Sequence, residues 1–173
     1  KLNIIAPFGL KPFDPNDPAA LNFAGEISLD VEWSHAIAPG ATIDLVLGNP
    51  VDSSLQGQLV AAINATVFAA NNNLGSVFSL SLGAGETCYN SAELQAWHQA
   101  FATATANHAT VYVSAGDSGS AVAECDSTGT PIALVQGVEY PGSDPLVTGV
   151  GGTSLLATQS GKYIGETTWN ESC

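Results

Sequence analysis

The sequence contains very few positive charges. Its 173 residues include 3 Lys and Arg against 16 Asp and Glu, which gives a formal net charge of -13 at pH 7. A surface with so few cations cannot neutralise phosphate groups, so binding to nucleic acid or to an anionic membrane is excluded. The sequence also lacks any apolar run long enough to cross a bilayer, so it predicts no membrane-spanning helix.

Charged residues of either sign are sparse, but hydrophobic residues are not. They make up 11% and 45% of the chain, a composition that folds instead of remaining disordered. A surface with few ion pairs loses little stability when carboxylates take up protons, which suits an acidic medium. An ordinary acidic secreted or halophilic protein has the same composition, so both interpretations remain open. At this length we expect one domain or part of one.

Three cysteines, Cys88, Cys125 and Cys173, allow one disulfide and leave one thiol over. None of them forms a CxxC pair and no His lies at zinc-finger spacing, so we predict no metal site in this chain. A disulfide would require an oxidising compartment, which favours a secreted protein. The triplets beginning at Asn64 and Asn170 fit the glycosylation sequon and leave that modification open.

Predicted strands and helices alternate over the first two-thirds of the chain. β-Branched and apolar runs predict strands at residues 2–6, 42–47, 77–81 and 110–114. Apolar residues at helical spacing predict helices at residues 21–37, 52–71 and 91–107, the second capped by Asp52 or Ser53. Strands separated by such helices form βαβ units, so the sequence predicts an α/β fold with a parallel sheet and flanking helices.

This alternation ends after Gly116. Residues 7–18 are rich in proline and predict a loop, and residues 118–145 are rich in turn-forming residues and predict another. Shorter strands are predicted at residues 146–150, 154–157 and 162–167. In α/β sheets the catalytic and binding residues lie at the carboxyl ends of the strands, so we expect the functional residues of this chain at those ends.

Glu26 and Asp30 lie four residues apart on the first predicted helix, so their carboxyl groups project from one face. Two neighbouring carboxyl groups can share a proton in acid, which suits a general base in a medium where His is already protonated. Acidic pairs at this spacing are more often solvated surface, so the spacing alone favours a structural role. The neighbouring Glu32 is most simply surface charge.

Asp117 directly follows the predicted strand at residues 110–114, in the run Ser-Ala-Gly-Asp-Ser-Gly-Ser. Glycine and small residues at the end of a strand let the backbone of a ligand approach closely. An Asp that caps the following turn is the alternative, and by itself the more common role. The run Ser-Leu-Ser-Leu-Gly at residues 79–83 ends the preceding strand similarly, and two such strand ends can pair with an extended peptide.

Five short runs occur in a fixed order along the chain. They are Gly-Glu-Ile-Ser-Leu-Asp-Val-Glu at 25–32, Ala-Pro-Gly-Ala at 38–41, Ser-Leu-Ser-Leu-Gly at 79–83, Ser-Ala-Gly-Asp-Ser-Gly at 114–119 and Val-Gly-Gly-Thr at 150–153. In this order they resemble the sedolisin (serine-carboxyl) peptidase family, including its kumamolisin-like members. The resemblance implies a subtilisin-like α/β fold, of which residues 1–173 would be the N-terminal portion of the catalytic domain.

The resemblance also implies an acid-acting endopeptidase or tripeptidyl-peptidase with a Ser-Glu-Asp triad. Glu26 would be the general base, Asp30 would orient it and share its proton, and Asp117 would donate to the oxyanion from a protonated carboxyl. Glu139 would shape the pocket for the side chain before the cleaved bond. The residues that would pair with the substrate backbone are Leu82, Gly83, Ala115 and Gly116.

The sequence departs from the family pattern at several points. The Ser-Gly-Thr-Ser motif that carries the family's nucleophile is absent. Ser154 directly follows the Val-Gly-Gly-Thr run, which lies upstream of that motif in the family, so we do not expect Ser154 to be the nucleophile. The family's calcium site would lie in a missing C-terminal part, so no cofactor is expected in this chain. Leu82 stands where many relatives have an aromatic residue. We therefore expect the chain to be inactive without a companion C-terminal polypeptide that carries the nucleophilic serine.

The leading hypothesis is part of a secreted acid peptidase that acts on peptides or proteins in an acidic, oxidising compartment. Cys88 and Cys125 lie in loops after neighbouring strands, so we predict that they pair, and Cys173 could then bridge to missing sequence. The alternative is that all three thiols are free. The alternative to a peptidase is a catalytically inactive peptide-binding or structural module that retains the cleft. A nucleotide-binding domain is disfavoured because the phosphate-binding glycine motifs are missing.

Overall fold

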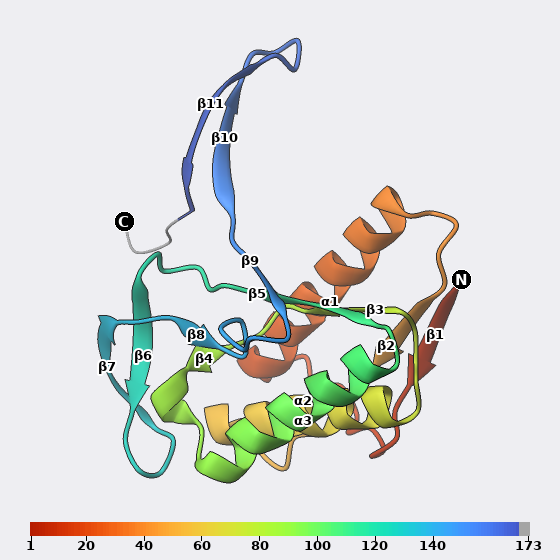
Figure 1. Cartoon of the computed structure of the whole chain (residues 1–173), viewed down its shortest axis with the longest axis vertical. Coiled ribbons are helices and arrows are strands. Elements are labelled where there is room, and N and C mark those ends of the chain that lie inside the picture. The colour runs from red at the N-terminus through yellow and green to blue at the C-terminus, as the bar shows by residue number, and fades with distance from the viewer. Residues whose placement is uncertain (170–173) are drawn as a thin grey trace. The chain divides into compact units, whose positions relative to one another are not determined.

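The computed structural model, drawn in Figure 1, describes residues 1–169. The chain divides into two compact units. The first unit comprises residues 1–76 and 91–109, and the second comprises residues 77–90 and the chain from Thr110 onward. The sequon at Asn170 and the thiol of Cys173 lie outside the described residues.

The first unit contains two short parallel strands and three helices. Its elements are β1 (Leu2–Ile5), α1 (Pro18–Ile37), β2 (Ile43–Val46), α2 (Leu55–Asn71) and α3 (Ser91–Ala106). Strands β1 and β2 pair in parallel, with Leu2 opposite Ile43. The order β1, α1, β2, α2 confirms the predicted alternation of strands and helices over residues 2–71.

The side-by-side helices α2 and α3 form the core of the first unit (Figure 1). The stacked rings of Trp97 and Phe101 lie 5.4 Å apart and are fully buried. The side chain of Gln56 on α2 donates to Glu93 on α3 at 2.5 Å, and Asn107 donates to the carbonyl of Ala70 at 3.3 Å. Apolar packing is therefore reinforced by hydrogen bonds near both ends of the helix pair.

The helix starts differ from the sequence predictions. Helix α1 begins at Pro18, within the predicted proline loop, because proline tolerates the first helical position and the Asp17 carboxylate accepts from the Ala19 amide at 2.9 Å. The cap of α2 is Ser54, whose hydroxyl accepts from the Gly57 amide at 3.0 Å. The predicted cap Asp52 instead accepts from the Ser54 amide and hydroxyl.

The second unit is built around a parallel three-stranded sheet in the order β3-β5-β9. Its elements are β3 (Val77–Leu80), β4 (Ala84–Gly85), a 3₁₀ turn (Glu86–Cys88), β5 (Thr110–Ser114), β6 (Ala121–Cys125), β7 (Pro131–Gln136), β8 (Glu139–Tyr140), β9 (Thr148–Val150), β10 (Thr153–Ala157) and β11 (Tyr163–Thr168). The remaining pairs, β4 with β8, β6 with β7 and β10 with β11, are antiparallel.

The prediction of a loop-rich segment at residues 118–145 is wrong. Strands β6 and β7 form a hairpin there, closed by a turn in which the Asp126 carboxylate accepts from the amides of Thr128 and Thr130. Every residue of β7 is exposed, so this strand has no buried face to produce an alternating apolar pattern. The turn-forming residues were therefore the dominant signal in the sequence.

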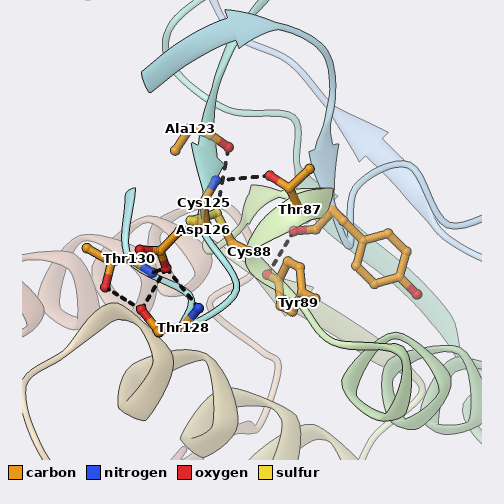
Figure 2. The surroundings of a disulfide bond; sticks show 9 residues. Thr87, Cys88, Tyr89, Ala123, Cys125, Asp126, Thr128 and Thr130 are labelled. Atoms are coloured by element: carbon orange, nitrogen blue, oxygen red, sulfur yellow. Dashed lines mark hydrogen bonds between the residues drawn. A yellow bond between two sulfur atoms is a disulfide. The ribbon is translucent and has the colours of Figure 1, made fainter. Parts of the chain in front are cut away.

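The predicted disulfide between Cys88 and Cys125 is present and ties the 3₁₀ turn to the end of β6 (Figure 2). Beside it, the Cys125 amide donates to the Thr87 hydroxyl at 3.0 Å. Both half-cystines are buried, at 2% and 8% exposure. The bridge therefore fixes the segment after β3 to the hairpin that follows β5.

Removing this disulfide should destabilise the protein. Because it closes a loop with a sequence separation of 37, the Cys88→Ala/Cys125→Ala variant should lose about 2–4 kcal/mol of unfolding free energy. Urea denaturation of the complete catalytic domain measures the loss. Reductant should lower the stability of the parent protein and leave that of the double variant unchanged. If the parent protein and the double variant are equally stable without reductant, the assigned bridge is contradicted.

Candidate active site

The carboxyl ends of β3 and β5 meet at one edge of the sheet in the second unit. The parallel register sets Leu80 opposite Val113, so the segments that follow the two strands start side by side. The Ser114 hydroxyl donates to the Leu82 carbonyl at 3.3 Å and joins these segments directly. The predicted backbone-binding residues, Leu82 with Gly83 and Ala115 with Gly116, therefore occupy neighbouring strand ends.

Glu139 on β8 extends its side chain between these two strand ends. A Cβ placed on Gly83 would lie 2.7 Å from Glu139 Oε2, and one placed on Gly116 would lie 2.7 Å from Glu139 Cδ. Real Cβ atoms almost never come so close to another atom, so a side chain at either glycine would require the Glu139 carboxyl group to shift from this position. A half-buried carboxyl group thus lies between the two segments that were predicted to pair with a substrate.

The surroundings of Glu139 favour its protonated form. Burial raises the pKa of the Glu139 carboxyl above its usual value, and the negative charge of Asp117 raises it further. Asp117 itself is exposed and follows Gly116, whose positive φ of 90° turns the chain away from the end of β5. Two acidic groups therefore lie near each other at this edge of the sheet.

Substituting Gly116 should displace Glu139. Gly116 has a φ of 90° and Gly161 in the β10–β11 turn has a φ of 80°, but only Gly116 has a neighbour in the path of a Cβ. Gly116→Ala should therefore lower the unfolding free energy by about 0.5–1.5 kcal/mol more than Gly161→Ala, because only the first forces a neighbouring side chain, that of Glu139, out of its position. Denaturation of the complete catalytic domain measures both losses, and equal losses would contradict the contact.

Glu26 and Asp30 lie on α1 in the first unit. Both residues are partly buried, while Glu32 on the same helix is exposed. Their spacing places the two carboxyl groups on one face of the helix, one turn apart. Glu26 and Asp30 therefore share one helix face, as their spacing predicts, and both are less exposed than Glu32.

The sequence did not predict a role for Tyr140 and Asp144, which lie close to Glu139 in the second unit. Both are buried, and the Tyr140 hydroxyl donates to Asp144 Oδ2 at 3.0 Å. A tyrosine and an aspartate four residues apart around Pro141 and Gly142 are the only sequence signal for this contact. Such a signal carries no meaning until the turn between them is known.

The described residues do not fit a bound metal or a membrane span. Within residues 1–169, no three His, Cys, Asp or Glu side chains are grouped so that they could hold a metal ion. No helix in the described range is long and apolar enough to cross a bilayer.

The chain is similar to two curated peptidases. It is 39% identical over 150 residues to sedolisin of Pseudomonas sp. (strain 101) and 33% identical over 158 residues to kumamolisin of Bacillus sp. (strain MN-32). These matches cover 85% and 91% of this chain but only 24% and 25% of the relatives. The chain therefore spans about a quarter of the length of the curated relatives it matches.

A solved structure shares both fold and sequence with the chain. Pseudomonas sedolisin, a serine-carboxyl proteinase complexed with two molecules of pseudo-iodotyrostatin, matches with a TM-score of 0.74 at 33% identity. The match covers 98% of this chain and 45% of that one. No protein-family model matches the chain.

Parallel strands with flanking helices define the chain as an α/β protein with the subtilisin-like fold of sedolisin. In sequence and in fold, it belongs to the sedolisin family and corresponds to one part of its members.

Proposed function

We propose that residues 1–173 form the N-terminal portion of the catalytic domain of a serine-carboxyl peptidase that cleaves peptides or proteins in acid. The observation that carries this proposal is the 39% identity to sedolisin over 150 residues. The neighbouring glycine-containing ends of β3 and β5 support it independently, because an extended peptide can pair with strand ends of this kind. Endopeptidase and tripeptidyl-peptidase action are both compatible with this edge.

In the proposed mechanism each carboxyl group has a separate role. Glu26 takes the proton of the nucleophilic serine, and Asp30 orients Glu26 and shares its proton. Asp117, when protonated, donates a hydrogen bond to the oxyanion that forms on the cleaved carbonyl. Acid is thus a working condition of the proposed chemistry.

In this proposal a C-terminal segment supplies the nucleophilic serine, because no Ser-Gly-Thr-Ser motif occurs within residues 1–173. Helix α1 offers this segment an apolar surface, since none of the helix residues is fully buried. Leu29, Trp33 and Ile37 are 51%, 63% and 80% exposed and recur every four residues along one stripe. The companion segment would cover this stripe, and any calcium would bind within that segment.

Substrate recognition is proposed to involve both backbone and side chain. The peptide would pair in extended form with Leu82 and Gly83 on one side and with Ala115 and Gly116 on the other. Glu139 between them would contact the side chain before the cleaved bond, and a carboxylate there favours Lys or Arg. The disulfide and the scarcity of cations support action in a secreted or other acidic, oxidising compartment.

The preference for Lys should depend on pH. Because the pKa of Glu139 is raised, its charge and hence the preference for Lys over Gln should appear only as pH rises through this raised value. We expect the ratio of kcat/KM for two peptides that differ only at that residue to increase with pH. In Glu139→Gln the ratio should stay flat, and a rise of equal size in this variant would contradict the assignment.

The proposed function is tested by peptide cleavage with the complete polypeptide encoded by the gene. Cleavage in acid that disappears when the serine of its Ser-Gly-Thr-Ser motif is replaced by alanine supports the peptidase. Peptide binding without cleavage by the complete protein would instead identify the non-catalytic module.

A further inference from the structure

Glu139 lies on a strand of only two residues, so its position must be fixed by other contacts. Strand β8 pairs with β4 through Ala84 opposite Tyr140 and Gly85 opposite Glu139. Successive side chains of a strand point to opposite faces, so Glu139 and Tyr140 extend in opposite directions. Glu139 reaches the two glycines of the substrate edge, while Tyr140 is 7% exposed and points into the protein.

Contacts of its hydroxyl, ring and carbonyl hold Tyr140 in place. Its hydroxyl donates to Asp144 Oδ2 at 3.0 Å, its ring meets the ring of Tyr89 edge-on at 5.6 Å, and its carbonyl accepts from the Tyr89 hydroxyl at 2.9 Å. Asp144 is only 4% exposed, and its other oxygen accepts from the Leu146 amide at 2.9 Å. Hydrogen bonds to a buried carboxylate are strong and directional, so Tyr140 has little freedom to move.

The turn closed by Tyr140 and Asp144 also lies against the end of β5. A Cβ on Gly142 would be 2.6 Å from the carbonyl oxygen of Ser114, the last residue of that strand. The Ser143 amide donates to the Glu139 carbonyl at 3.1 Å and ties the turn back to β8. Any shift of this turn would therefore move Glu139 relative to the strand end that leads to Gly116.

We propose that Tyr140 and Asp144 are positioning residues that set the preference for a basic residue before the cleaved bond. Their hydrogen bond holds β8 so that the Glu139 carboxyl stays between Gly83 and Gly116. The inference rests on the proposed function, because it assumes that Glu139 contacts the substrate. It adds two residues that do not touch the substrate and act only through Glu139.

The test compares kcat/KM for Lys and Gln peptides on variants of the complete catalytic domain, at a pH where the parent protein prefers Lys. Tyr140→Phe keeps the ring but removes the donor, and Asp144→Ala removes the acceptor. Each should lower the Lys/Gln ratio about fivefold to tenfold, while cleavage of the Gln peptide changes less than about twofold. Asp144→Asn retains an acceptor for Leu146 and a polar partner for Tyr140, so it should keep the parent ratio. Tyr163→Phe removes a hydroxyl from a tyrosine that is 59% exposed and serves as the matched control.

The outcomes separate this inference from the proposed function. If Glu139→Gln abolishes the preference but Tyr140→Phe and Asp144→Ala keep it, the positioning inference alone is wrong. If Glu139→Gln keeps the preference, the contact between Glu139 and the substrate is wrong and the inference falls with it. Equal losses on both peptides in Tyr140→Phe and Asp144→Ala would show a purely structural role and would also overturn the inference.

Discussion

Glu26→Gln in the complete catalytic domain should lower kcat by about 10²–10⁴-fold, because the variant loses the general base that takes the serine proton. Substrate binding should change little, since the amide keeps the shape of the carboxyl group and Glu26 acts on the nucleophile. Steady-state kinetics on a peptide substrate in acid measure the loss. The KM should stay within about threefold of the parent value if only transition-state stabilisation is lost.

Glu32→Gln provides the control for this variant. Glu32 lies on the same helix, carries the same group and is exposed, so its substitution changes the net charge equally without touching the proposed site. It should retain nearly full activity. Comparable losses in both variants would mean that the charge of α1, and not the chemistry of Glu26, matters, and would remove Glu26 from the mechanism.

The second large effect is expected from Asp117→Ala. The variant loses the proposed donor to the oxyanion, and removing one such donor lowers kcat by about 10²–10³-fold. Asp117 is exposed at the end of β5, so the substitution should leave the unfolding free energy within about 0.5 kcal/mol of the parent value. Kinetics and urea denaturation on the same preparations separate the two effects.

Ser120→Ala in the same loop is the matched control for Asp117→Ala. Ser120 is exposed, and its carbonyl, which the substitution leaves in place, accepts from the Gly137 amide at 2.9 Å. This variant should keep its activity. An Asp117→Ala variant that works as well as Ser120→Ala would show that Asp117 only shapes the turn after β5.

The sequence predicted the elements whose pattern is local. Strand β5 was placed at residues 110–114, the range that the structure shows, because its run of β-branched and aromatic residues is typical of a strand. The chemistry of the 25–32 run came from family resemblance, since its i, i+4 carboxyl pair alone is typical of an ordinary helix surface. The β6–β7 hairpin was missed because its second strand is exposed throughout and shows no alternation of apolar and polar residues.

The arrangement around Glu139 could not be predicted from the sequence. Its carboxyl lies between Gly83 and Gly116, which are distant in the chain and meet only because β3 and β5 pair in parallel. The raised pKa follows from burial and from the charge of Asp117, and both depend on tertiary structure. The hydrogen bond between Tyr140 and Asp144 likewise depends on the turn that connects them, and the sequence of this turn does not specify its conformation.

The pH dependence of kcat/KM for peptide cleavage by the complete protein tests the central claim, catalysis by carboxyl groups, most directly. Because Asp117 must be protonated to donate and the carboxyl pair replaces a His base, we predict maximal activity in acid and a steep fall as pH approaches neutrality. Activity that rises through the usual His pKa of about 6.5 and peaks at or above neutral pH would contradict the account.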